Sequence, residues 1–269
     1  GVSWARSVYK RQVIRILNEV APPSLAEEWD NVGLMVGRTD EPVRVILCAL
    51  DYSAEVLAQA RELRANLIVT HHPAIFKGIR HLTDEDWHTS LLLDAARENI
   101  AVFSAHTNLD SAIGGINDVL AELLGLDGVE TLCEQAGTLA GIGRVGVLPE
   151  PKEVAVFADT VREKLGLPHI TYAPAGAMVR KVAVCSGAGM DFLDAALRSG
   201  ADTYVTGDVK YHEAQDAVGK GINVIDGTHQ ATELIMMNHL ADRLALRLSR
   251  DSYATRVLVA KETPLFRVL

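Results

Sequence analysis

The sequence has few cysteines and no long apolar run. Only 3 of the 269 residues are Cys, so disulfide bonds are not expected to hold the fold together. Cys48 and Cys185 stand inside apolar runs, which favours buried thiols that pack as small hydrophobic side chains. No apolar run reaches the roughly 20 residues that span a bilayer, and no charged-then-apolar leader opens the sequence. These absences predict a reducing, membrane-free compartment, the cytoplasm.

The sequence also has fewer basic than acidic residues. Lys and Arg number 26 against 35 Asp and Glu, which gives a formal net charge of −9. A surface that neutralises many phosphates is therefore not expected, and this argues against nucleic acid as a partner. A local basic or metal-bearing pocket would still suit one anionic small molecule. With 48% hydrophobic residues, the chain is long enough to bury one large core or two small ones.

Strand-length apolar runs alternate with helix-length segments in two successive blocks. The expected strands are 43–50, 66–70 and 100–105 in the first block, and 179–187, 202–206 and 222–226 in the second. Short Val- and Ile-rich runs are typical of strands covered on both faces, and helices between them fit parallel crossovers. The pattern predicts an α/β protein made of two related lobes with mostly parallel sheets.

Three further segments complete this plan. Residues 136–152 contain several Gly and Pro residues, which predicts turns and an edge strand at the boundary between the lobes. A long amphipathic helix is expected over 229–248 and a closing strand over 252–260. We therefore assign residues 1–130 to an N-terminal lobe and residues 131–269 to a C-terminal lobe. The 229–248 helix is expected to contribute ligands to a cleft shared by the two lobes.

Polar residues able to bind metal follow the ends of four predicted strands. In chain order, these strands lead into His71 and His72, into His106 and Asp110, into Asp208, Lys210 and His212, and into His229. In open parallel sheets, ligands bind beyond the carboxyl ends of the strands, where the loops converge. The sequence therefore predicts one ligand site at these strand ends.

Each of these motifs alone has an ordinary explanation. His71 and His72 would serve as capping or core histidines about as readily as metal ligands. His229 and Glu233 lie four residues apart, on one face of a helix, but such pairs are usually solvated. Asp110 precedes a predicted helix and would normally be its N-cap. Their occurrence together favours a metal site.

The chemistry of these five side chains limits the ions they would hold. Imidazoles and carboxylates without a thiolate suit borderline divalent ions such as Zn, Fe, Mn or Ni, and do not suit an iron–sulfur cluster. If one carboxylate bridges two ions, each ion has about three protein ligands and keeps open positions for water and substrate. Two such ions and two carboxylates leave a net positive site, which attracts phosphate or a polarised carbonyl.

Five separated motifs carry a family resemblance. They are EEWDNVGLMVG at 27–37, THHPAIFKGI at 70–79, SAHTNLDSAIGGIND at 104–118, VCSGAG at 184–189 and GDVKYHEAQDA at 207–217. In this order, over nearly the whole chain, they resemble the Nif-three-like dinuclear metal-centre family, whose bacterial members include GTP cyclohydrolase I type 2 homologues. The 127–178 stretch is too short for the extra domain of longer relatives, so the chain resembles the compact form.

The resemblance implies two α/β lobes that face each other across a metal cleft, and a toroidal homo-hexamer. It also implies two divalent metal ions per subunit and their ligands, which are His71 with Asp110 for one ion, His72 with His229 for the other, and Glu233 as the bridge. Thr228 stands where the family usually has Gly before the last His. This departure concerns the turn rather than a ligand.

The predicted site favours a metal-dependent hydrolase that acts on a nucleotide or another phosphate-bearing small molecule. His106 and His212 are candidate catalytic residues for proton transfer, or they orient the ligands. Lys210 and Arg80 would hold an anionic group or remain solvated. Trp29, Asp30 and Asn31 would line the cleft, with a packing anchor as the alternative role of Trp29. The alternative is a non-catalytic metal-binding scaffold that interacts with other proteins.

A dinucleotide-binding interpretation is also open to the second block. Gly187 and Gly189 follow a predicted strand, and Asp208 lies about twenty residues further on, as in the dinucleotide fingerprint. The third glycine of that fingerprint is Phe192 here, and its side chain would block the close approach of helix and strand. The sequence therefore argues against this interpretation.

Overall fold

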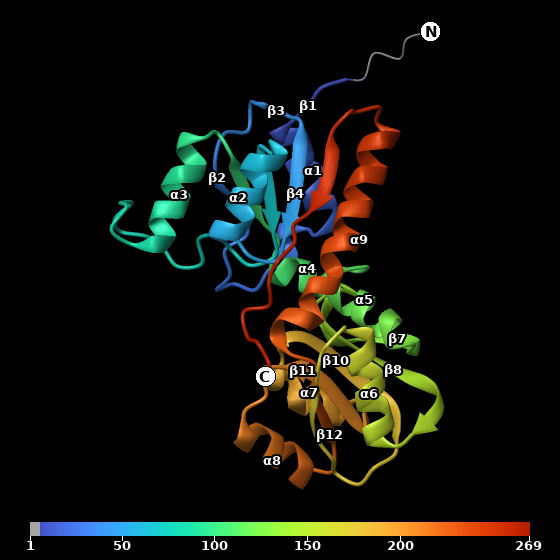
Figure 1. The fold of residues 1–269 in the computed structure, drawn as a ribbon. Helices are drawn as coiled ribbons and strands as arrows, with labels where there is room; N and C mark the ends of the chain where they lie inside the picture. The colour runs from blue at the N-terminus through green and yellow to red at the C-terminus, as the bar shows by residue number, and fades with distance from the viewer. Residues whose placement is uncertain (1–5) are drawn as a thin grey trace. The chain divides into compact units, whose positions relative to one another are not determined.

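The computed structural model describes residues 6–269, which form two compact units (Figure 1). One unit contains the described residues up to Leu109 together with Met237–Pro264, and the other contains Asp110–Met236 together with Leu265–Leu269. The predicted lobes, 1–130 and 131–269, instead divide the chain at a single point, and that division stays a prediction. The long helix α9 (His229–Arg250) supplies residues to both units. Helical periodicity does not reveal where a helix changes its packing partners.

The first unit is built on a five-stranded sheet of order β13-β4-β5-β6-β2. Neighbouring strands are parallel, except that β2 runs antiparallel to β6. The strands are β2 (Gly33–Val36), β4 (Val45–Ala49), β5 (Leu67–Thr70), β6 (Ala101–Ser104) and β13 (Arg256–Val259). Around them lie α1 (Lys10–Val20), η1 (Pro23–Leu25), α2 (Ala54–Leu63), α3 (Trp87–Arg97), the start of α4 (Thr107–Ser111) and a small ladder of β1 (Val8–Tyr9) with β3 (Pro42–Val43).

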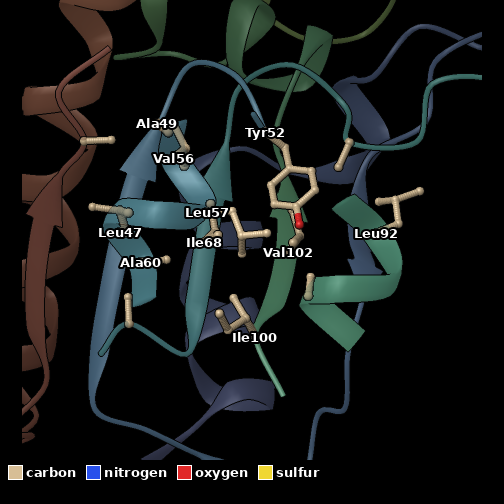
Figure 2. Close-up of a cluster of buried hydrophobic side chains, with 14 of the residues drawn as sticks. Leu47, Ala49, Tyr52, Val56, Leu57, Ala60, Ile68, Leu92, Ile100 and Val102 are labelled. Carbon is tan, nitrogen blue, oxygen red and sulfur yellow. The ribbon is translucent and has the colours of Figure 1, made fainter. Parts of the chain in front are cut away.

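The central strands of this sheet are buried on both faces. Leu47 and Ala49 of β4 belong to one hydrophobic cluster with residues of α2 and α3 (Figure 2). Ile46 and Cys48 alternate with them along the strand and are also buried. Because both faces are covered, these strands show continuous apolar runs instead of alternating polarity. The strands predicted at 43–50, 66–70 and 100–105 are confirmed by β4, β5 and β6.

The second unit is built on a six-stranded sheet of order β7-β8-β10-β11-β12-β9. Its strands are β7 (Asp127–Glu134), β8 (Gly141–Lys152), β9 (Thr171–Ala173), β10 (Val179–Ala188), β11 (Thr203–Gly207) and β12 (Asn223–Asp226). Its helices are α5 (Ile116–Leu123), α6 (Val154–Lys164), η2 (Met190–Phe192), α7 (Leu193–Arg198) and α8 (Tyr211–Gly219). Residues 127–178 thus belong to this unit, as expected for the compact form.

The six-stranded sheet is parallel only at its centre. β10, β11 and β12 are parallel neighbours, whereas the outer pairings with β7, β8 and β9 are antiparallel. Alternate residues of β10 enter different cores: Val184 packs in a cluster with α5 and α6, while Cys185 packs in a cluster with α7 and α8. The α/β class is confirmed, and the prediction of mostly parallel pairing holds for the first unit alone.

The prediction of turns within 136–152 is confirmed at residues 136–139, but the prediction of an edge strand was wrong. β8 pairs with β7 on one side and with β10 on the other, so it lies inside the sheet. A Cβ on Gly141 would collide with the carbonyl oxygen of Cys133, and one on Gly146 would lie 3.0 Å from the carbonyl oxygen of Asp127. Gly141 and Gly146 allow neighbouring backbones to approach closely, and the sequence pattern does not distinguish such glycines from those in turns.

Within residues 6–269, no helix combines the length and apolar character that crossing a membrane requires. The predicted lack of a leader concerns the beginning of the chain, and residues 1–5 lie outside the described part. The absence of a leader therefore stays a prediction. Cys48 and Cys185 are buried free thiols, as the sequence predicted.

Candidate metal centre

Three imidazoles meet at the carboxyl ends of β5 and β6 in the first unit. β5 leads directly into His71 and His72, and β6 leads through Ala105 into His106. The parallel register pairs Thr70 with Ser104, the last residues of the two strands. The segments that follow β5 and β6 therefore begin side by side at the same edge of the sheet. The ring centroids of His71 lie 5.1 Å from His72 and 5.2 Å from His106. One nitrogen of each ring lies within 4.8 Å of the others, a group able to hold a metal ion.

Each of these rings is oriented through its Nδ1 atom by an oxygen acceptor. The pairs are His71 Nδ1 with Ala105 O at 2.9 Å, His72 Nδ1 with Asp51 Oδ1 at 2.8 Å and His106 Nδ1 with Asp30 Oδ1 at 2.8 Å. Carbonyl and carboxylate oxygens accept only, so in a neutral ring Nδ1 carries the proton and Nε2 keeps its lone pair. This arrangement is typical of imidazoles that bind metal through Nε2.

Asp51 is itself held by a residue from the far end of the chain. Glu262 follows β13, and its carboxylate accepts from the amide of Leu50 at 2.6 Å and from the amide of Asp51 at 3.0 Å. Burial raises the pKa of Glu262, against the opposing effect of these two amides. Glu262 therefore fixes the backbone that presents Asp51 to His72. Sequence reasoning missed both carboxylates, although each lies just beyond a predicted strand.

Asp30 orients His106 from a fully buried position. Its side chain is 0% exposed, and Oδ2 accepts from the amide of Thr107 at 3.0 Å. Burial by itself raises the pKa of Asp30, but the hydrogen bonds from His106 and Thr107 outweigh it and lower the pKa to about 2. Asp30 is therefore ionised at neutral pH, and it fixes the ring of His106.

In the second unit, His229 and Glu233 form a close pair at the start of α9. His229 Nε2 lies 3.2 Å from Glu233 Oε2. His229 Nδ1 lies 2.8 Å from Asp208 Oδ2, so this fourth imidazole is also oriented by an acceptor. Thr228 has a φ of +63°, the left-handed conformation that explains the usual Gly at this position. The amide of Thr228 donates to Asp226 Oδ1 at 2.9 Å, which supports the strained turn.

Gly187 lies against this pair. β10 has a bulge before Ala188, and Gly187 there has a φ of +66°. A Cβ at Gly187 would collide with Glu233 Oε1 and would lie 3.4 Å from His229 Nε2. A Cβ at Gly189 would lie 2.7 Å from Cys185 Cβ. Both glycines are thus explained by close packing, without a bound dinucleotide.

Asp110 lies in α4 and contacts Ser186 of β10. Its Oδ1 accepts from Ser186 Oγ at 3.1 Å, and its backbone oxygen accepts from Asn117 Nδ2 at 3.1 Å. The N-cap of the following helix α5 is Gly115. The N-cap explanation of Asp110 was therefore wrong, and its carboxylate instead contacts Ser186.

Two other predicted residues are exposed at the start of α8, where Lys210 is the N-cap and His212 lies in the first turn. His212 is exposed, with its Nδ1 3.3 Å from Gln215 Oε1 and its ring against Tyr211. Lys210 is 82% exposed, and its Nζ lies 3.6 Å from Glu213 Oε1. Neither joins a metal-competent group among the residues that the structure describes. The catalytic role of His212 stays a prediction.

Comparison with known proteins matches this chain to one family. The model of the Duf34/NIF3 (NGG1p interacting factor 3) family matches residues 8–264. The chain belongs to the Duf34/NIF3 family. The match includes every predicted metal ligand as well as Asp30, Asp51 and Glu262, so the resemblance found in the sequence is confirmed.

Several Duf34/NIF3 relatives are similar along most of their length. A GTP cyclohydrolase 1 type 2 homolog from Clostridium perfringens is 35% identical over 252 residues, which covers 93% of this chain and 95% of the relative. Another, from Lactococcus lactis, is 37% identical and covers 83% and 86%. A crystal structure of a Bacillus cereus protein related to NIF3 has a TM-score of 0.92 at 25% identity, and covers 98% of this chain and all of that one. A Staphylococcus aureus hypothetical protein has a TM-score of 0.93 at 27% identity, with the same coverage.

Proposed function

We propose that the protein binds two divalent metal ions through His71, His72, Asp110, His229 and Glu233, and uses them to hydrolyse a phosphate-bearing small molecule. The observation that carries the proposal is the orientation of the imidazoles. The Nδ1 atoms of all three ligand histidines face oxygen acceptors, which leaves Nε2 as the metal-binding atom in each. Surface histidines have no need for such consistent support.

The donor set fits a borderline divalent ion. Imidazole and carboxylate groups supply every proposed ligand, and Zn, Fe, Mn and Ni all accept this combination. We assign His71 with Asp110 to one ion, His72 with His229 to the other, and Glu233 to the bridge. A metal pair of this kind activates water at neutral pH and stabilises negative charge on the substrate.

The chain's own residues would then position the substrate and move protons. Asp30 fixes the ring of His106 beside His71 and His72, so His106 is the candidate for proton transfer. His212 remains a second candidate. The name GTP cyclohydrolase 1 type 2 homolog, given to the relatives, supports a nucleotide as the substrate.

A metal and activity assay tests this proposal. The purified protein should contain about two metal ions per chain, and it should turn over GTP or a member of a phosphoester panel when supplied with Mn, Zn or Fe. Glu233→Ala should lose both metal and turnover, because the proposed bridge is gone. His71→Ala and His229→Ala should each lower metal content, whereas His239→Ala, an exposed histidine on the same helix α9, should not.

The rival function is a metal-binding scaffold, favoured by the family description as an interacting factor. Full metal content without turnover on any substrate would support it and contradict the hydrolase. A homo-hexamer and a cytoplasmic location belong to the proposal as well. Sedimentation of the metal-loaded protein checks the assembly, and a particle smaller than six chains would contradict it.

Glu262→Gln is expected to weaken zinc binding about tenfold, the lower end of the effect of residues behind a metal ligand. Two backbone amides donate to the two carboxylate oxygens of Glu262, whereas Gln has one acceptor oxygen. The NH₂ group of Gln would face one of these N–H groups, and the backbone of Asp51 would lose its support. Competition with a chromogenic chelator measures the affinity. Glu55→Gln is the matched control, because Glu55 holds the same segment at Thr263 without touching Asp51. Equal affinities in the two variants would contradict the prediction.

A further inference from the structure

Two large aromatic side chains are exposed beside His71, His72 and His106. Trp29 is 62% exposed and Phe76 is 46% exposed. Their ring centroids lie 5.9 Å apart with an interplanar angle of 75°, and each lies 6.2 Å from the ring centroid of His106. We call Trp29 and Phe76 the aromatic pair. Aromatic side chains commonly line ligand-binding sites, because each offers a large apolar face to a ligand.

Hydrogen bonds hold the backbone segments that carry the aromatic pair. Asp30, which follows the first ring of the pair, bonds to His106 and to the amide of Thr107. Asn31 Nδ2 donates to the carbonyl oxygen of Ile75 at 2.6 Å, and so joins the two loops next to the rings. Both loops are therefore held in place before a ligand arrives. Preorganisation of this kind lowers the entropy cost of binding.

We propose that the aromatic pair stacks against the planar heteroaromatic ring of the substrate, which is a nucleoside or nucleotide. This inference rests on the proposed function and adds the residues that would bind the base of its substrate. Aromatic side chains bind bases through their π-faces regardless of base identity. A base stacked there would lie on the side of the site that carries His106, whose ring centroid is 6.2 Å from each ring of the pair.

Positive charge in the same loop fits the anionic part of such a substrate. Lys77 directly follows the aromatic pair in the chain, and Arg80 lies three residues later. Neither forms an ion pair with another residue of the described range 6–269. A planar base and a phosphate together are the chemistry of a nucleotide, and a protein partner would not need both features beside the imidazoles.

Fluorescence titration of the zinc-loaded 269-residue protein tests the inference. Guanosine and GTP should quench the wild-type fluorescence, and ribose 5-phosphate should not. Trp29→Leu should abolish the quenching and weaken guanosine binding about tenfold or more. Phe76→Leu should weaken guanosine binding by a smaller factor, and Trp29→Phe, which keeps an aromatic face, should retain most of the affinity. Trp87→Leu is the matched control, because Trp87 is 71% exposed and lies outside the pair.

Zinc content and oligomeric state are measured on the same samples. Trp29→Leu is expected to keep the wild-type zinc content, so lost guanosine binding reports on the pair and not on the metal ligands. Wild-type guanosine affinity in folded Trp29→Leu, with or without a changed oligomeric state, would overturn the inference. If the pair binds guanosine but the protein holds no metal and turns over nothing, the proposed function fails while this inference stands.

Discussion

Gly187→Ala is expected to weaken zinc binding about a hundredfold or more, an effect at least as large as that of residues behind a metal ligand. The added methyl group would collide with Glu233 Oε1, and it would lie 3.3 Å from Glu233 Cδ and 3.4 Å from His229 Nε2. Glu233 would have to rotate away from the position in which it is proposed to bridge the ions. The measurement is a zinc titration in competition with a chromogenic chelator, with urea unfolding on the same samples.

Gly166→Ala separates this steric effect from backbone strain. Gly166 has a φ of +67°, almost the same as the +66° of Gly187, and a Cβ there meets no atom within 4 Å. Each substitution should cost about 1 kcal/mol of folding free energy, since a residue with a Cβ is strained in this conformation. Only Gly187→Ala should lose zinc affinity. An unchanged affinity in that variant would mean that Glu233 is not a ligand in the observed position.

Asp118→Ala is expected to lower the free energy of unfolding by about 3 kcal/mol, the cost of breaking a buried ion pair by removing one partner. The guanidinium of Arg144 is 2% exposed, and Asp118 accepts from its Nε and, at 3.0 Å, from its Nη2. Arg144 also donates to the carbonyl oxygens of Gly141, Gly143 and Ala112. Removing Asp118 leaves a buried charge without its counter-ion. Urea unfolding at neutral pH measures the loss.

Glu98→Ala is the control, because it removes one partner of an exposed ion pair. Glu98 pairs with Arg61 at comparable distance, but both side chains are more than a third exposed. Water and salt screen such a pair, so its removal should cost less than about 1 kcal/mol. If Asp118→Ala cost no more than Glu98→Ala, the three carbonyl groups alone would account for the stability of buried Arg144.

Much of the fold could be predicted from local pattern. The runs at 43–50, 66–70 and 100–105 became strands because continuous apolar residues of that length are stable only when both faces are covered. Helix α9 was expected over 229–248 and spans His229–Arg250, since a 3.6-residue period identifies long helices reliably. The interior position of β8 was missed, because a glycine in a turn and a glycine packed against a neighbouring strand are indistinguishable in sequence.

For the candidate site too, local sequence and tertiary contacts decide different features. The sequence by itself determined which side chains have metal chemistry and that they follow strand ends, because residue type and the 2.0 and 3.6 periods are local properties. Only the tertiary structure decided that β5 and β6 end level, that Glu262 secures the backbone of Asp51, and that Gly187 makes room for Glu233. Strand register and close approach depend on contacts between distant segments, and no local pattern records them.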